Sequence, residues 1–436
     1  MKVERLLLLG MGSVQRSLIE LLDVDKSPLR KLKMTCICPE DIPQYIYKLQ
    51  PHIEHIQASI TESNMKQLIL PLIGENVFVI DLTVDTDSIA IMKLCKEHNT
   101  LYINSSVEEY HKPDHPKDPE KLTLYYQDIQ LEKEMKNVKS DTTTLHSLGL
   151  NPGAITSLVF KAITEYCKKY KPEKLDLLKQ GKYNIVCKDI LELIHISEFD
   201  NQEIKQKPNK DCLYNSWSAK GLIAEALSPA FIASPIKPKG FKKSKYNKYM
   251  YYSDKYRSMQ CSTNSICLDP RGNPFPITGR MITHFETVSL ADKLSYGKYV
   301  PIITYVYSSS PISQIGLNNI IDNNFKEPQN TYVFNQHDIV NKDSFDSMGA
   351  CLKFKDGRVF WCGTVLDNEK TIKLMGKNTY SNATQLQVSI AVLSGIEWLM
   401  KHKHKDTITS EEIPYNYIIN RCLPYCGKFY CVEISN

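Results

Sequence analysis

The first hundred residues alternate short apolar runs with stretches of helical spacing. Residues 4–9 (ERLLLL) form an apolar run that stops at Gly10-Met11-Gly12-Ser13-Val14, and SLIELL beyond it has a helical period. Later strand-like runs are MTCICPED, NVFVIDLTVD and LYINSS, and the helix candidates between them are NMKQLILPLI and SIAIMKLCKEHN. Strands and helices alternating at these lengths predict a doubly wound parallel sheet, a Rossmann-type α/β domain.

The pattern changes near residue 140. TLHSLGLNPG (144–153) predicts a strand that enters a turn at Asn151-Pro152-Gly153, and AITSLVFKAITEY predicts a helix. Strand-like runs and turns mix over 175–330, whereas 382–400 has the spacing of an amphipathic helix expected to pack on the sheet and close the fold. We therefore expect three parts: a Rossmann domain (1–145), an α+β substrate-binding and catalytic domain (146–380), and a C-terminal helix and tail (381–436) that packs back on the Rossmann domain.

Composition is that of a soluble globular protein. The chain has 436 residues, 42% hydrophobic, and a net charge of +5 that is too small to favour a nucleic-acid partner. No apolar run reaches the ~18 residues of a membrane span, and the N-terminus lacks a secretory signal pattern. We expect a cytoplasmic protein with no membrane association.

The cysteines and the lysine-rich segment 237–257 could each form a binding site, but neither pattern requires one. The thirteen cysteines show no disulfide-framework spacing and no flanking histidines at zinc-finger spacing, so ordinary thiols and no metal are expected. Segment 237–257 interleaves lysines with tyrosines and could bind phosphates or stack bases. A solvated loop or β-hairpin explains that segment equally well, and we favour that interpretation.

The glycine turn is a weak motif placed in a favourable context. Gly10 and Gly12 satisfy the first two positions of a dinucleotide fingerprint, but Gln15 occupies the third. Because the turn opens a βαβαβ pattern, the following helix would direct its N-terminus at a pyrophosphate. Glu40 and Asp41 could accept bonds from an adenosine ribose, and since no arginine lies beside them, NAD is favoured over NADP.

Several acids are candidates for a site. Asp85 is expected to end its strand and Glu108 to follow the next one, both at the carboxyl edge where open α/β sheets bind ligands. Glu198 closes ILELIHIS and Glu225 lies in YNSWSAKGLIAEAL, where Trp217 is expected to precede the first helical turn and Ser218 to cap it. The remaining candidates lie in ITHFET, where strand alternation would place His284 and Glu286 on one face.

Taken together, these segments resemble a known family. GMGSV, DLTVDTDS, YINSSVEEY, GLNPG, ISEFDNQ, SWSAKGLIAEALSPA, THFET, SNATQLQVSIAVL and LPYCG occur in the order found in bacterial-type homospermidine synthases, of the saccharopine dehydrogenase-like group. The resemblance covers most of the chain. It departs at FIASPIKPK, after Ser228-Pro229-Ala230, where the family has Gly-Trp-Gly-Thr-His-Glu, and at YINSS, where the family has a tryptophan and an Asp-Thr pair.

The resemblance implies an NAD-dependent enzyme that joins two putrescines, or putrescine and spermidine, into sym-homospermidine, releasing ammonia or 1,3-diaminopropane. It also implies a homodimer. The implied catalytic residues are Trp217, Glu225, His284 and Glu286; the implied substrate-binding residues are Asp85, Glu108, Asn151 and Glu198. The residues assigned to the cofactor are Gly10, Gly12, Ser13, Val14, Thr83, Ser105 and Asn151.

The residue types suit that chemistry. A diamine offers only two charges, so carboxylates spaced to meet them provide recognition. A tryptophan face stabilises a developing iminium by ~0.5–2 kcal/mol and cannot trap it as a nucleophile would. An amine must lose its proton before it reacts, and His284, with Glu286 or Glu225 as a relay, is the candidate base; the sequence leaves the choice among the three open.

Two other functions remain open at this point. A carboxyspermidine or saccharopine dehydrogenase would need an arginine for the substrate carboxylate, and Arg280, four residues before His284, keeps that alternative open. A non-catalytic protein that binds NAD and polyamines is the second alternative, although the presence of the whole set of catalytic residues argues against it.

Overall fold

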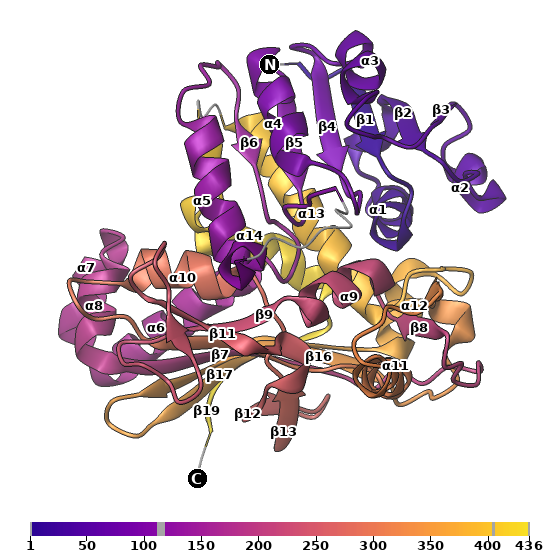
Figure 1. Cartoon of the computed structure of the whole chain (residues 1–436). Helices are drawn as coiled ribbons and strands as arrows, with labels where there is room; N and C mark the ends of the chain where they lie inside the picture. Colours follow the sequence, from indigo (N-terminus) through magenta and orange to yellow (C-terminus); the bar gives the residue numbers. More distant parts are fainter. Residues whose placement is uncertain (1, 111–117, 403–405, 435–436) are drawn as a thin grey trace.

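The computed structural model describes residues 2–110, 118–402 and 406–434. It contains two large sheets, each the centre of one domain, and the first domain lies above the second in Figure 1. Within the described residues the upper sheet has seven parallel strands in the order β18-β6-β5-β4-β1-β2-β3. Their bounds are β1 Arg5–Leu9, β2 Lys33–Cys38, β3 Glu54–Gln57, β4 Val77–Asp81, β5 Leu101–Asn104, β6 Thr144–Leu145 and β18 Thr407–Ile408.

Strand β1 shows why this sheet forms. Leu6 and Leu8 point into one hydrophobic core, and Leu7 and Leu9 point into a second core on the opposite face. A continuous apolar run is what a parallel strand covered on both faces requires. The helices of this domain are α1 Ser13–Val24, α2 Gln44–Leu49, α3 Met65–Ile69, α4 Ser88–Glu97 and α5 Leu124–Met135. The predicted α/β architecture is confirmed.

The lower sheet is mixed. Its main order is β10-β11-β9-β14-β7-β16-β17-β19, with β12 and β13 branching from β14. β7 runs parallel to β14 and antiparallel to β16. The strands are β7 Leu191–Asp200, β9 Pro229–Ala233, β10 Lys242–Lys243, β11 Met250–Arg257, β12 Ser262–Leu268, β13 Pro274–Arg280, β14 Ile302–Ser308, β16 Phe345–Phe354, β17 Val359–Asp367 and β19 Lys428–Ile434. A separate pair joins β8 Cys212–Asn215 to β15 Asn330–Val333.

Helices cover this second sheet and fill the space between the domains (Figure 1). α6 packs against β16 and β17, α10 against β14, and α9 against β8 and β15. The helices are α6 Ile155–Tyr170, α7 Leu175–Lys179, α8 Tyr183–Ile190, α9 Ala219–Leu227, α10 Glu286–Leu294, α11 Pro311–Asp322, α12 Asn368–Met375, α13 Ala383–Lys401 and α14 Tyr415–Cys422.

The C-terminal segment belongs to both domains, which differs from the expectation for 381–436. Helix α13 packs along α1 and β5, and β18 extends the upper sheet through β6. Helix α14 packs on α6, however, and β19 pairs with β17 over seven residues in the lower sheet. The physical reason is that β17 would otherwise present an open hydrogen-bonding edge, which the last strand covers.

The lysine-rich segment 237–257 contains the hairpin β10–β11, one of the two structures expected for it. Its turn bonds to the first domain: Ser244 Oγ and Lys245 N donate to the buried carboxylate of Glu120, and Lys245 Nζ lies 2.7 Å from Asp118 Oδ2. Tyr125 Oη also donates to Glu120, at 3.0 Å. The hairpin therefore acts as a contact between the domains.

The remaining features are ordinary. All thirteen cysteines are free thiols, most of them buried. In the described ranges no group of histidine, cysteine and acidic side chains is arranged to hold a metal ion. No helix there is long and apolar enough to cross a membrane.

Replacing Glu120 tests the contact between the domains. Glu120→Ala leaves the buried donors from Ser244 and Tyr125 unpaired, so the free energy of unfolding is expected to fall by about 1–3 kcal/mol. Asp118→Asn removes the partly exposed ion pair with Lys245 but keeps a side-chain oxygen to accept from Glu120 N, so it should cost about 1 kcal/mol or less. Urea unfolding of both variants measures this, and equal losses would contradict the interpretation.

Candidate active site

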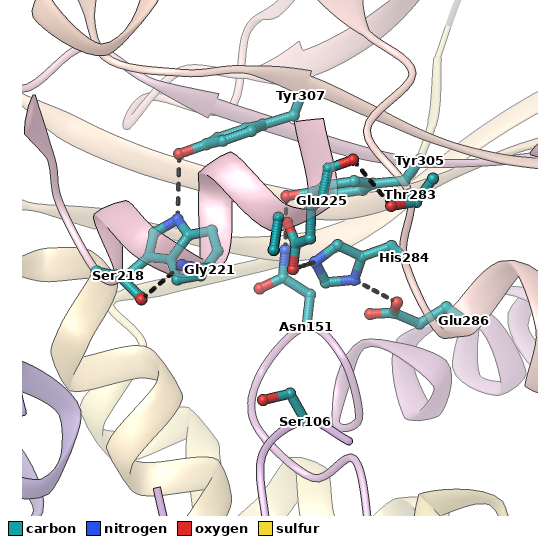
Figure 2. Close-up of polar contacts among 12 residues, drawn as sticks. Ser106, Asn151, Ser218, Gly221, Glu225, Thr283, His284, Glu286, Tyr305 and Tyr307 are labelled. Carbon is teal, nitrogen blue, oxygen red and sulfur yellow. Dashed lines mark hydrogen bonds and ion pairs between the residues drawn. The ribbon is translucent and has the colours of Figure 1, made fainter. Parts of the chain in front are cut away.

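The site lies where the two domains face each other, at the carboxyl edge of the upper sheet. Figure 2 shows Asn151, Glu225 and His284 directed toward a common space, with Glu286 behind the histidine. Asn151 comes from the loop between β6 and α6, and Glu225 from α9. The topology thus collects residues that are far apart in the sequence.

His284 is held between two carboxylates. Its Nδ1 lies 2.6 Å from Glu286 Oε2, and its Nε2 lies 3.8 Å from Glu225 Oε1. Burial lowers the pKa of His284, but Glu286 and Glu225 together outweigh burial and raise the pKa to about 9. The ring is therefore charged at neutral pH in the free site.

The strand predicted for ITHFET is wrong. His284 lies in the loop after β13, and Glu286 begins α10. A carboxylate in the first turn of a helix is stabilised by the helix dipole, which explains why the chain turns helical here. The two side chains still meet, because the loop directs His284 back onto the helix start.

Glu225 is poised between charge states. Burial raises the pKa of its carboxyl to about 8, and Glu108 raises it further while His284 opposes the rise. Its Oε2 is buried without a hydrogen-bond partner among the described residues. Its backbone carbonyl is fixed by Thr283 Oγ1, at 3.1 Å, and by Ser258 Oγ, at 2.6 Å. A buried acid with a free oxygen is suited to accept a proton from a ligand.

A second cluster joins Asn151, Glu198 and Tyr305. Asn151 Nδ2 donates to Glu198 Oε2 and to Tyr305 Oη, each at 2.8 Å, and the Tyr305 hydroxyl donates to Glu198. Burial raises the pKa of Glu198 to about 7. The Tyr305 ring contacts His284, with 4.2 Å between ring centroids, so the two clusters form one site.

Trp217 lies beside this site, immediately before α9. Ser218 caps the helix by accepting from Gly221 N at 3.0 Å, which confirms the expected cap. The indole Nε1 donates to Tyr307 Oη at 3.4 Å, and Ser13 Oγ donates to the Trp217 carbonyl at 2.7 Å. The second domain therefore holds the indole ring through Tyr307, and the first domain holds the Trp217 backbone through Ser13.

Asp85 and Glu108 approach from the first domain. Both line a cavity of about 1100 Å³ whose other wall includes Gly221 and Ala224 of α9. β4 ends at Asp81, so Asp85 does not end the strand as expected: it lies in the loop that follows, with a φ of 63°. Burial raises the pKa of Glu108 to about 7, and Ser106 Oγ donates to it at 2.6 Å.

Sequence reasoning missed four buried residues around this site. Tyr305 and Tyr307 follow each other on one face of β14, and Asp200 and Asp346 are paired between β7 and β16. Burial raises the pKa of Asp200 to about 6, and burial with Glu198 and Asp200 raises the pKa of Asp346. The available signal was an ionisable or hydroxyl-bearing residue inside an otherwise apolar strand, as in ITYVYS and FDSMGACL.

The glycine turn has a geometry compatible with a dinucleotide. Gly10 has a φ of 82°, and a Cβ there would lie 3.2 Å from Thr83 Cγ2, so β1 and the loop after β4 approach closely. Gly12 precedes the first turn of α1, which holds Ser13 and Val14. Ser105 follows β5 at the same sheet edge. These positions surround the crevice where open sheets bind nucleotides.

Three further residues bear on how this turn could bind a dinucleotide. Gln15, at the third fingerprint position, is buried, so the helix accommodates its side chain where a glycine would allow closer packing. Glu40 and Asp41 are exposed beyond β2, as a ribose contact would require, and Gln57 Nε2 donates to Asp41 at 3.3 Å.

Known proteins share this sequence and this fold. Residues 6–145 match the family model described as saccharopine dehydrogenase NADP binding domain. Homospermidine synthase of Mesorhizobium japonicum is 27% identical over 96% of this chain and 88% of its own length, and that of Blastochloris viridis is 25% identical over 97% and 89%. The resemblance to homospermidine synthases is confirmed.

Solved structures support the same fold. The homospermidine synthase of Legionella pneumophila, solved in complex with NAD, aligns with a TM-score of 0.85 and 24% identity over 99% of this chain and 91% of its own. Saccharopine dehydrogenase of Saccharomyces cerevisiae, solved in its apo form, aligns at 0.56 with 12% identity over 99% and 100%. The homospermidine synthase fold thus extends across both domains, including the part that the family model does not match.

The buried charges predict how stability depends on pH. In the folded state the pKa values of Glu108, Glu198 and Glu225 lie near 7, 7 and 8, and that of His284 near 9, all above the values of about 4.3 and 6.5 in an unfolded chain. The folded protein therefore binds more protons than the unfolded protein between about pH 4.5 and 9, and its stability falls as pH rises through this window.

Thermal unfolding of the ligand-free protein at pH 6, 7, 8 and 9 measures this dependence. The midpoint is expected to fall steadily, and Glu225→Gln should flatten the fall because it removes one of the four titrations. A midpoint that rises over this range would contradict the raised pKa values assigned to these carboxyls.

Gly221 is expected to be essential for the position of Trp217. A Cβ at position 221 would lie 2.9 Å from Trp217 Cζ3 and 3.1 Å from Ser218 Oγ, so Gly221→Ala must displace the indole ring or the cap. Binding of a cationic ligand should weaken by about tenfold, near the upper range of a cation–π contact. Calorimetry with a diamine such as putrescine measures the loss. Gly181→Ala is the control: alanine is strained at its φ of 74°, but nothing lies within 4 Å of the added Cβ, so binding should be normal.

Proposed function

We propose that this protein is a homospermidine synthase, which uses NAD to join two putrescines, or putrescine and spermidine, into sym-homospermidine. The observation that carries the proposal is the cluster of Glu198, Glu225 and Glu286 around a single histidine, with Trp217 bonded to Tyr307, whose ring stacks on Tyr305 of the cluster. Carboxylates in excess of cations favour a ligand that brings positive charge. Putrescine and spermidine are such ligands, and each is long enough to reach more than one carboxylate.

The residues divide the work of the reaction. Asp85 and Glu108 line the outer cavity and are positioned to attract the incoming amine, while Glu198 and Asn151 offer acceptors to the ammonium group held deepest. We assign Trp217 the stabilisation of the cation that develops when an amine carbon is oxidised, because a tryptophan face attracts a cation. NAD, when bound, supplies reversible hydride transfer, and Gly10, Gly12, Ser13, Val14, Thr83, Ser105 and Asn151 are the residues proposed to hold it.

Proton transfer is assigned to Glu225, His284 and Glu286 acting together. In the ligand-free protein burial raises the pKa of Glu225 to about 8, so its carboxyl is mostly protonated at neutral pH. A bound ammonium group lowers that pKa, and the unpartnered Oε2 of the resulting carboxylate is then the acceptor for a proton from the amine. His284 touches Glu225 on one side and Glu286 on the other, so it can pass the proton on. We therefore propose Glu225 as the base that meets the amine, and His284 with Glu286 as the relay behind it.

The position of Arg280 disfavours a dehydrogenase that acts on a carboxylate substrate. Its guanidinium donates to the backbone carbonyl of Met259 and, at 2.6 Å, to Asn318 Oδ1. Both partners lie outside the cluster around His284. The arginine that such a substrate would require is thus engaged elsewhere.

The family resemblance further supports a cytoplasmic homodimer, which light scattering of the purified protein would test. The proposed site needs no residue from a second copy, because all the residues named above belong to one chain.

The decisive assay incubates the purified protein with NAD⁺ and putrescine and measures amines and ammonia. Homospermidine and ammonia are expected to form in equal amounts without net NADH, because the hydride is returned to the new imine. Trp217→Ala should reduce turnover by about tenfold or more while NAD⁺ affinity is retained. Steady net formation of NADH, or loss of NAD⁺ binding in the variant, would contradict the proposal.

A further inference from the structure

A chain of buried hydrogen bonds crosses the carboxyl edge of the upper sheet, from the end of β4 to the loop after β6. Tyr102 Oη donates to Asp81 Oδ2 at 2.7 Å, and Asn104 Nδ2 donates to Tyr102 Oη at 3.1 Å. The backbone N–H of Ser147 donates to Asn104 Oδ1 at 2.9 Å. Each of these four residues is at most 2% exposed, and none of them has a role in the reaction described above.

Asp81 connects this chain to a residue assigned to the cofactor. Asp81 Oδ1 accepts from Thr83 N at 3.2 Å and from Thr83 Oγ1 at 2.6 Å. Burial raises the pKa of Asp81, and the hydrogen bonds from Thr83 and Tyr102 oppose that rise. Donors on both of its oxygens therefore hold the carboxyl in one place, and the carboxyl in turn holds the loop at Thr83.

The other end of the chain lies in the loop that carries Asn151. Ser147 has a φ of 55°, in the left-handed region, so the backbone turns where Asn104 accepts its N–H. The loop then closes on itself, because Gly149 N donates to the Pro152 carbonyl at 2.6 Å. A closed loop keeps its shape, so the bond to Ser147 sets the direction in which the loop presents Asn151.

The hydrogen bonds of the chain run in one direction. A backbone N–H can only donate, so Asn104 must present its oxygen to Ser147 and its NH₂ group to Tyr102. The Tyr102 hydroxyl accepts that bond, which leaves its hydrogen for Asp81. A carboxylate suits the end of such a chain, because both of its oxygens accept. A buried network that is satisfied in this way is rigid.

We propose that Asp81 is a positioning residue, which fixes the loop at Thr83 relative to the loop that presents Asn151 to the amine. This inference rests on the function proposed above, in which Thr83 borders the cofactor and Asn151 meets the substrate. Transfer between two bound reactants requires that the groups holding them keep a fixed separation, and an error of about 1 Å is costly. Asp81 maintains that separation through the residues that hold the reactants.

Replacing Tyr102 cuts the chain with a small change of shape. On the intact protein saturated with NAD⁺, Tyr102→Phe is expected to weaken putrescine binding by about fivefold, the effect of one lost hydrogen bond. NAD⁺ affinity should stay within about twofold of the parent, because Thr83 keeps both of its bonds to Asp81. Calorimetry measures both affinities.

Tyr125→Phe is the matched control. Tyr125 is a fully buried tyrosine of the same domain, and it donates to the carboxylate of Glu120 at 3.0 Å, outside the chain. Its loss should lower the thermal midpoint in the same way as Tyr102→Phe, but putrescine should bind as it does to the parent. Equal weakening of putrescine binding by the two variants overturns the inference.

A double-mutant cycle distinguishes positioning from a general loss of order. Since Tyr102 is inferred to act through Asn151, adding Tyr102→Phe to Asn151→Ala should weaken putrescine binding by less than about twofold more. The same loss in that background as in the parent means that the hydroxyl acts elsewhere, and the inference is then wrong. Circular dichroism confirms that each variant is folded.

The other end of the chain is tested with the cofactor alone. Asp81→Ala releases the loop at Thr83 and should weaken NAD⁺ binding by about fivefold, but by less than about twofold when Thr83→Val is already present. Asp81→Ser, whose hydroxyl can still meet one donor, replaces it if the alanine variant does not fold. An equal loss in both backgrounds overturns the inference. Because this titration needs no amine, a protein that binds NAD⁺ but no putrescine contradicts the proposed function and still leaves the role of Asp81 to be decided here.

Discussion

The excess of buried carboxylates over cations is the constraint on which the site depends. Glu198, Glu225 and Glu286 surround His284, and Asp200 and Asp346 lie directly behind Glu198. Isolated ionised carboxylates cannot be buried in such numbers without a large cost, so several hold their protons until a cation arrives. The raised pKa values of the site carboxyls are the result of this cost of burying charge. When a cationic ligand leaves water and binds, these carboxyls therefore release protons.

This constraint explains why the site is built from both domains. The deep acids lie on β7 and β16, whose neighbours keep them rigid and dry, whereas Asp85 and Glu108 lie in loops at the edge of the upper sheet. Rigid strands can hold like charges close together, since the backbone resists the repulsion that would separate flexible loops. Loops suit the entrance, where a substrate must pass.

The sequence predicts the upper domain well, because local patterns decide it. ERLLLL and the glycine turn specify a buried strand, a tight turn and a helix within twenty residues, and the structure forms all three. The ITHFET segment shows the limit of this reasoning. Its alternation suits a strand, but the favourable position of the Glu286 carboxylate in the first turn of α10 and the packing of α10 against β14 outweigh the local pattern.

Local sequence patterns cannot predict contacts between residues that are far apart in the chain and meet only in the folded protein. Asp346 is 148 positions from Glu198 and reaches it only because β16 pairs with β7. Tyr305 bonds to Glu198 for a similar reason, through β14. No local spacing reports such pairings. A family resemblance supplied the acids that this sequence shares with known motifs, but the side chains that support them required the structure.

The path of the last fifty residues has a consequence for how the chain folds. The upper sheet, built mostly from residues 5–145, is completed at one edge by β18, and one of its faces is covered by α13. During synthesis residues 383–408 follow the whole second domain. The apolar face that α13 covers therefore stays exposed until that segment has been made, so the upper domain cannot complete its packing before the second domain has been synthesised.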